Sequence, residues 1–160
     1  DEPVSALDVS IQAQVLNLLG DLKKRLGLTL VFVTHDLRVV NFFCDRIAVM
    51  YMGRLVELGT RKQIMEESRH PYTRMLLSAA PRDEPGVEID RPWVKNELDA
   101  TAPLGNACNF AARCWARQAL GNPERCMTER PEDHPREDGR VVACHFEEQI
   151  PALAAAETAR

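Results

Sequence analysis

The chain has 160 residues, a formal net charge of −4 and 45% hydrophobic residues, which are ordinary values for a globular protein. The mild acidic excess argues against a nucleic-acid-binding or anionic-membrane surface. No apolar run approaches the roughly 18 residues of a spanning helix, and the acidic start does not resemble a secretory signal. The chain lacks an initiator Met and opens inside what reads as a motif, so we expect a fragment that an N-terminal part precedes.

The first predicted element is an amphipathic helix. Apolar residues recur at helical spacing over residues 11–26, with Asp8 or Ser10 as the expected N-cap and Gly27 as the stop. The continuous apolar run Leu28–Val33 then predicts a strand buried on both faces, as in a parallel sheet.

Short elements follow in alternation. Asp36 is placed to cap a helix over Leu37–Phe43, and a strand is expected over Arg46–Met52. The remaining elements are a short strand at Leu55–Leu58, a helix from Thr60 to about Glu67, and a helix from Pro71 and Tyr72 to about Ala80. Alternation of this kind predicts an α/β fold.

The composition changes at Pro81. Residues 81–103 are rich in proline and charge and predict an extended linker, whereas residues 115–124 predict one short helix. We therefore divide the chain into residues 1–80, a C-terminal extension over 81–150, and a flexible or frayed helical tail over 151–160.

Two acidic residues and a histidine form the first candidate site. Asp1 and Glu2 are adjacent carboxylates, of the kind that hold hydrated Mg²⁺ and orient an attacking water in phosphoryl transfer. His35 directly follows the predicted strand Leu28–Val33, at the strand end where ligands gather in parallel sheets. An acidic pair alone is also explained by a solvated loop, and His35 alone by a helix-capping or solvated side chain.

These residues carry a resemblance to a known family. Asp1–Asp8 followed by Thr34–Asp36 resembles the second half of an ABC-transporter ATPase subunit, which implies the C-terminal part of a P-loop NTPase domain. The resemblance implies that Asp1 ends the Walker B strand and helps hold Mg²⁺, that Glu2 activates the water, and that His35 senses the γ-phosphate of ATP. It also implies a D-loop at the interface of a nucleotide-bound dimer, formed by Ser5, Ala6, Leu7 and Asp8.

A second resemblance narrows the family. Tyr51–Gly59, His70–Thr73, Leu76-Leu77 and Pro81 resemble the ATPase subunits of oligopeptide and dipeptide importers. This implies a peripheral protein on the cytoplasmic face of the inner membrane, which hydrolyses ATP to drive import of peptides or similar small solutes. The implied partners are a second ATPase subunit, transmembrane permease subunits and, indirectly, an extracytoplasmic solute-binding protein.

Four cysteines form the second candidate site. Their spacing is C-x₅-C-x₁₁-C-x₁₇-C, and without a secretory signal such a group favours metal or redox chemistry over a disulfide framework. Four thiolates can hold Zn²⁺ or a [4Fe–4S] cluster, and the spacing does not choose between them or exclude unligated or disulfide-linked cysteines. Some members of the importer family hold a [4Fe–4S] cluster on the matching residues, which here are Cys108, Cys114, Cys126 and Cys144.

Other residues near these cysteines are candidates for supporting roles. Phe110, Trp115 and Val142 could shield such a group, Arg113 could donate to its sulfurs, and His145 could lie in its outer shell. Outside this region, the isolated Cys44 is expected to be a small core residue, and the histidine that precedes Pro71 is expected to be a turn element.

The functional expectation has two branches. The 160 residues contain no G-x-x-x-x-G-K-[ST] loop, no glutamine loop and no signature sequence, so we expect the chain alone to be inactive as an ATPase. The alternative is a non-enzymatic metal-binding interaction module, in which Cys108–His145 is the active part.

Overall fold

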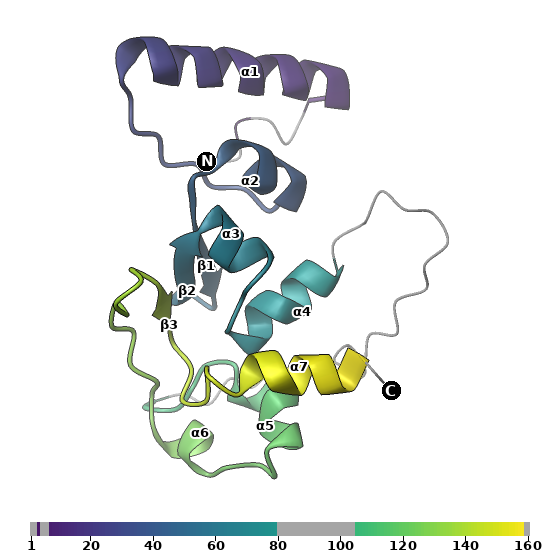
Figure 1. Ribbon diagram of the computed structural model, residues 1–160, viewed down its shortest axis with the longest axis vertical. Helices are drawn as coiled ribbons and strands as arrows, with labels where there is room; N and C mark the ends of the chain where they lie inside the picture. Colours follow the sequence, from purple (N-terminus) through teal and green to yellow (C-terminus); the bar gives the residue numbers. More distant parts are fainter. Residues whose placement is uncertain (1–2, 4–6, 80–104, 159–160) are drawn as a thin grey trace. The chain divides into compact units, whose positions relative to one another are not determined.

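The structure is a computed structural model that describes residues 3, 7–79 and 105–158. The chain forms two compact units, Asp1–Asp45 and Arg46–Arg160 (Figure 1). The predicted division near residue 80 and the predicted linker 81–103 lie outside the described residues, so the domain division stays a prediction. No helix in the described part of the chain is both long and apolar enough to cross a membrane.

The first unit begins with α1, Val9–Leu26. The Asp8 carboxylate accepts a hydrogen bond of 2.9 Å from the Ile11 backbone N–H, which satisfies one of the free donors of the first turn. Gly27 ends the helix in the left-handed region at φ 61°, and both Gly27 and Leu28 donate backbone N–H groups to the Lys23 carbonyl. The predicted helix and both of its end signals are confirmed.

A short helix completes this unit. The helix α2 spans Leu37–Phe43, as predicted, and the Asp36 side chain caps it by accepting a 2.9 Å hydrogen bond from the Arg38 N–H. Leu16 and Val39 form a small buried core, with three partly buried neighbours packed against them: Val15, Phe32 and Phe43.

The predicted strand Leu28–Val33 is wrong for the described chain, because these residues form no strand there. Four of its apolar side chains are exposed, and Val31 is 92% exposed. A strand exists only through hydrogen bonds to a neighbouring strand, and no described segment pairs with this one. The apolar pattern is present, but among the described residues only Phe32 of this segment packs against the small core of the unit.

The second unit contains a three-stranded sheet in the order β1-β2-β3. Its strands are β1 at Arg46–Tyr51, β2 at Arg54–Thr60 and β3 at Val141–Val142. Met52 and Gly53, both at positive φ, join β1 to β2 in a tight hairpin. Both pairings are antiparallel, so the parallel sheet expected from the sequence is not found among the described residues, although the mixture of helix and sheet is.

Two helices follow the hairpin. The helix α3 spans Arg61–Met65 and starts with a capping box, in which Thr60 and Gln63 bond each other's backbone N–H groups. A Cβ atom on Gly59 would lie 2.9 Å from the Gln63 Oε1 atom, so the small residue allows the helix start to approach β2. The helix α4 spans Pro71–Ala79 and begins at the proline, as predicted.

The C-terminal segments pack around one small core. They comprise a 3₁₀ turn at Ala111–Arg113, α5 at Trp115–Ala119, α6 at Arg125–Thr128 and α7 at Ile150–Thr158. Trp115 and Ala116 of α5 pack against Ile150 and Ala154 of α7. The helix α7 includes Ile150, which is 0% exposed, and most of the predicted tail 151–160, where Ala154 is 5% exposed.

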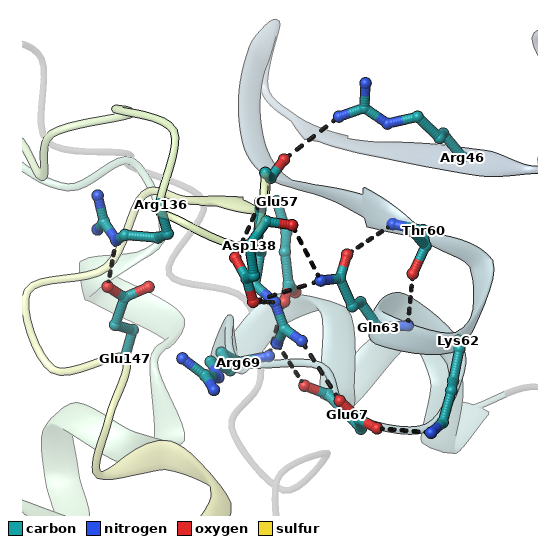
Figure 2. A network of polar contacts seen from close by, with 12 residues as sticks. Arg46, Glu57, Thr60, Lys62, Gln63, Glu67, Arg69, Arg136, Asp138 and Glu147 are labelled. Atoms are coloured by element: carbon teal, nitrogen blue, oxygen red, sulfur yellow. Dashed lines mark hydrogen bonds and ion pairs between the residues drawn. The ribbon is translucent and has the colours of Figure 1, made fainter.

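A buried polar network joins β2 to the segment before β3 (Figure 2). The Glu57 carboxylate accepts hydrogen bonds from the backbone N–H groups of Arg69 at 2.7 Å and His70 at 3.1 Å. The Arg140 guanidinium donates to the Glu67 carbonyl at 2.8 Å and pairs with the Asp138 carboxylate at 3.6 Å. These contacts hold residues 67–70, which precede α4, and residues 138–140, which precede β3.

Candidate functional site

Most of the residues predicted to act on ATP lie outside the described residues. These are Asp1, Glu2, Ser5 and Ala6. Of the remaining two in the opening stretch, Leu7 is 39% exposed and Asp8 caps α1. The predicted meeting of Glu2 with His35 therefore stays a prediction.

His35 lies in the bend that leads into α2, and it is exposed. Its two neighbours are fixed locally, because the Thr34 hydroxyl accepts a 3.1 Å hydrogen bond from the Asp36 N–H. The hydrogen bond from the Arg38 side chain lowers the pKa of Asp36, so this helix cap stays ionised at neutral pH. His35 is thus an exposed residue that directly precedes the capped start of α2.

The second unit brings all four predicted cysteines to one cavity. The cavity has a volume of about 20 Å³, and Cys108, Cys114, Cys126 and Cys144 all line it. Apolar side chains close much of its wall, among them Phe110, Leu120 and Ile150. Residues up to 36 positions apart in the sequence, from Cys108 to Cys144, therefore converge on one point.

Short local structures hold three of these cysteines. Cys108 donates its backbone N–H to the Cys126 carbonyl at 3.0 Å, which ties the two segments together. Cys114 is the N-cap of α5, and its sulfur accepts a 3.4 Å hydrogen bond from the Arg117 backbone N–H. Cys126 lies within α6. A thiol in a capping position is directed by the helix start rather than by packing alone.

The fourth cysteine is held by the residue before it. Ala143 donates its N–H to the Val56 carbonyl at 2.9 Å, and its backbone also bonds the His70 ring. The other side of that ring, at Nδ1, accepts a 3.1 Å hydrogen bond from the Tyr72 N–H. His70 is 1% exposed, and this burial lowers its pKa to about 3, so the ring is neutral. A neutral buried histidine therefore positions the segment that carries Cys144.

The four thiols share an apolar and mutually repulsive environment. Burial raises the pKa of every one of them, that of Cys114 to about 12, and the nearby Cys108 and Cys126 raise the pKa of Cys114 and of Cys144 further. All four are free thiols. In this state the group is neutral, and forming thiolates here requires a compensating positive charge.

The donor set fits a thiolate-bound group, although the geometry does not suit a single ion. Among the described residues, no three His, Cys, Asp or Glu side chains come together as ligands for one metal ion. One Zn²⁺ needs its sulfurs about 2.3 Å from the metal, hence closely gathered, and this arrangement gives no support to that alternative. What fits is the identity of the donors, their common cavity and the buried, unpartnered Nε–H of Arg117 beside them.

The residues expected to support the cysteines divide into two groups. Phe110 and His145 line the cavity, as predicted, and the His145 ring also lies 3.0 Å from the Glu129 carbonyl. Trp115 instead donates its indole N–H to the Pro71 carbonyl at 3.0 Å, and Val142 is buried in β3. The predicted donor Arg113 is not among the lining residues.

Sequence reasoning missed two residues at this site. His70 was interpreted as a turn element, and its link to the cysteine segment depends on a contact across 73 positions with Ala143. Arg117 lies three residues after Cys114, where a helix that starts at the cysteine turns it back to the same side. The helical spacing from Cys114 was the available signal for Arg117, while no local pattern pointed to His70.

Comparisons with known proteins agree with the family resemblance. Residues 56–120 match the sequence model of the family described as "Oligopeptide/dipeptide transporter, C-terminal region". The dipeptide transport ATP-binding protein DppF of Haemophilus influenzae is 45% identical over 144 residues, which cover 90% of this chain and 42% of that protein.

Two further relatives give the same picture. The oligopeptide transport ATP-binding protein OppF of Haemophilus influenzae is 42% identical, and the dipeptide transport ATP-binding protein DppF of Escherichia coli is 46% identical. They match over 90% and 93% of this chain, and the chain spans less than half the length of each. Over nine tenths of its length, the chain is therefore similar to dipeptide and oligopeptide transport ATP-binding proteins.

Proposed function

We propose that this chain is the C-terminal portion of an ABC-type ATPase subunit, a P-loop NTPase that powers import of dipeptides, oligopeptides or similar small solutes. The observation that carries the proposal is the sequence match over nine tenths of the chain to transport ATP-binding proteins. The order of motifs agrees with it: an acidic pair, a D-loop-like stretch and then a histidine.

Each motif residue has a role in this proposal. The Asp1 carboxylate holds Mg²⁺, which neutralises phosphate charge, and the Glu2 carboxylate orients the water that attacks the γ-phosphate. His35, exposed at the start of α2, donates a hydrogen bond to a γ-phosphate oxygen. Ser5, Ala6, Leu7 and Asp8 form the D-loop at the interface with a second ATPase subunit.

The remaining partners follow from the same family. Permease subunits would couple ATP hydrolysis on the cytoplasmic face of the membrane to transport of the solute. An extracytoplasmic binding protein would deliver the solute to them. We place the subunit peripherally, because its relatives are named as the ATP-binding components of transport systems. We propose no nucleic-acid partner, in line with the net charge of −4.

A chimera tests the ATPase proposal. The chain alone is expected to show no Mg²⁺-dependent ATP hydrolysis, because its 160 residues contain no phosphate-binding loop and no signature sequence. Joined in frame to the N-terminal part of the dipeptide transport ATP-binding protein of Escherichia coli, it should gain that activity. Substituting Glu2→Gln should then lower kcat by at least about 100-fold, because one group that positions the water is lost.

Two variants complete that experiment. His35→Ala should lower kcat strongly, whereas Asp21→Asn, on the exposed face of α1, should leave the rate unchanged. Hydrolysis by the unfused chain that Glu2→Gln abolishes would contradict the proposed division of the site. A folded chimera that binds ATP and is unaffected by Glu2→Gln would contradict the role of the acidic pair.

A second function is favoured by the four-cysteine cavity. We propose that Cys108, Cys114, Cys126 and Cys144 ligate a [4Fe–4S] cluster, and the supporting observation is their convergence on one apolar cavity. A cluster has four corners, so its sulfur ligands stand further apart than those of a single ion. When bound, the group would supply one-electron redox chemistry or a structural clasp, while Phe110 and Leu120 limit the access of water.

Anaerobic purification of the full chain tests this site. A cluster predicts a brown protein with broad visible absorbance, iron and sulfide in the protein, and loss of colour in Cys126→Ser. Cys44→Ser is the matched control, because this cysteine lies in the first unit at the end of α2. A colourless protein without iron after anaerobic reconstitution would contradict the cluster, and a zinc-loaded protein would favour the non-enzymatic metal-binding alternative.

A further inference from the structure

One charged side chain lines the cavity of the four cysteines without a complete set of partners. Arg117 of α5 is among the lining residues, and its Nε atom is buried with no hydrogen-bond partner in the described structure. The lining includes no Asp or Glu side chain that could neutralise it. The other lining residues with polar side chains are the four cysteines and two histidines, His70 and His145.

The position of Arg117 is fixed by its helix. Cys114 caps α5, and the Arg117 backbone N–H donates to its sulfur at 3.4 Å. At the other end, the Arg117 carbonyl accepts a 2.8 Å hydrogen bond from the Asn122 N–H. Trp115 and Ala116 pack into the core beside α7, so the helix cannot rotate freely. The backbone of Arg117 is therefore held beside Cys114, at the cavity that Arg117 lines.

An unpartnered buried N–H of a charged group is unfavourable. Leaving a buried donor unsatisfied is destabilising, and more so when the group is charged. The neutral thiols around it are weak acceptors, whereas thiolates would be strong, charge-assisted ones. The cavity thus contains a buried donor without a hydrogen-bond partner, for which an anionic sulfur group would be a strong acceptor.

We propose that Arg117 is the charge-compensating donor of the four-cysteine site, with its Nε–H directed at a sulfur of the thiolate-bound group. The inference rests on the proposed cluster site. It gives Arg117 the role of donor to the sulfurs, which the sequence predicts for Arg113. Four thiolates bring more negative charge than a single ion or cluster core removes, and the guanidinium offsets part of the remainder. Arg117 is then a positioning and charge-tuning residue rather than a ligand.

The proposal predicts opposite effects in the two states of the protein. In the metal-free chain, Arg117→Met removes an unsatisfied buried charge, so the melting temperature should stay unchanged or rise. In the iron-loaded chain, the same change removes a stabilising donor, so iron should be lost to a chelator about 10-fold to 100-fold faster. The reduction potential should also become more negative, because the reduced and more anionic state loses its nearby positive charge.

The experiment uses the full 160-residue chain, reconstituted anaerobically with iron and sulfide. Iron release to a chelator is followed by visible absorbance, and the potential by redox titration, for the unchanged chain, Arg117→Met and Arg117→Lys. Lysine keeps the charge without the planar donor, so it should restore most of the potential but less of the retention. Arg113→Met is the matched control, since it removes the arginine four residues earlier that does not line the cavity.

The possible results separate the two proposals. Faster iron release and a lower potential in Arg117→Met, with Arg113→Met unchanged, support the inference. An unchanged chain that loads iron while Arg117→Met behaves identically overturns the inference and leaves the cluster site standing. A marked fall in melting temperature of the metal-free Arg117→Met chain also overturns it, because the arginine would then have a purely structural role. An unchanged chain that takes up no iron overturns the cluster site, and the inference with it.

Discussion

The two compact units differ in which side chains they leave exposed and which they bury. In residues 1–45, large apolar side chains remain exposed, with Val31 at 92%, Phe42 at 67% and Leu26 at 65%. In the described part of residues 46–160, two charged side chains are buried, with Glu57 at 0% and Arg140 at 1% exposure. Apolar side chains are buried only where another segment packs against them. A buried charged side chain is stable where hydrogen-bond and ion-pair partners lie nearby. The second unit should therefore unfold as a defined unit, and its polar network should be its most sensitive part.

The largest effect is expected at Arg140. Arg140→Met removes the side chain that bonds the Glu67 carbonyl and pairs with Asp138, and it leaves the buried Glu57 without its nearby positive charge. Breaking one side of a buried charged network costs about 3–5 kcal/mol. Urea unfolding followed by the fluorescence of Trp115 should show this loss, because that residue lies in the second unit. Arg61→Met, an exposed arginine on α3, is the control and should change little.

Removing both partners sharpens that test. The double change Arg140→Met with Glu57→Gln should recover part of the lost stability, since the carboxylate no longer needs a counter-charge. Equal losses in the single and double variants would mean that the network contributes through packing rather than charge.

The second largest effect is expected in α7. Ile150→Ala deletes a side chain that is 0% exposed and packs with Trp115, and such deletions cost about 2–5 kcal/mol. Differential scanning calorimetry should show a lower melting temperature for this variant. Ala155→Gly, at an exposed position of the same helix, should cost only about 1 kcal/mol through helix propensity. If Ile150→Ala melts like the unchanged chain, the tail is not anchored in solution.

The helices could be predicted from sequence because their signals are local. Asp8, Asp36 and Thr60 each cap the helix that follows, and Gly27 ends the first one, as expected from their residue types. The hairpin of β1 and β2 was likewise marked by Gly53. These features depend on contacts within a few residues, which a single sequence contains.

The sheet and the cysteine site depend on distant contacts. The run Leu28–Val33 has the composition of a buried strand, but its state is decided by a neighbour that the sequence pattern does not contain. The cysteines could be grouped by residue type, whereas the role of His70 arises from its link to Ala143 in a segment far along the chain. Geometry could thus be predicted only where the chain makes it locally, while the chemistry of the cysteines stays a prediction from residue identity.

A smaller effect is expected from the protonation of His70. Burial lowers the pKa of His70 to about 3, so the folded chain keeps the ring neutral while the unfolded chain takes up a proton below about pH 6.5. Stability is then fully present above the unfolded pKa and is lost as the pH falls towards 3. By pH 5 the second unit should lose about 2 kcal/mol relative to neutral pH.

Comparing the unchanged chain with a His70 variant isolates the pH dependence that comes from this histidine. The pKa of Glu57 is raised by burial, which gives a pH dependence of the opposite sign, so the total curve alone is not decisive. His70→Asn keeps an acceptor for the Tyr72 N–H and removes the titration. Between pH 7 and pH 5, the unchanged chain should lose about 2 kcal/mol more of its free energy of unfolding than His70→Asn does. An equal change in the two proteins would contradict the prediction.

The smallest effect is expected in the first unit, at Val31. Because this side chain is 92% exposed, Val31→Thr changes no packed contact and should alter the free energy of unfolding by less than about 0.5 kcal/mol. Val39→Thr, at a buried position of the same unit, places a hydroxyl in the small core and should cost more than 1 kcal/mol, so it serves as the positive control. Far-UV circular dichroism during urea unfolding measures both, since α1 and α2 contribute helical signal. If Val31→Thr proves as costly as Val39→Thr, the segment is covered in solution, and the contrast between an exposed apolar first unit and an enclosed second one does not hold.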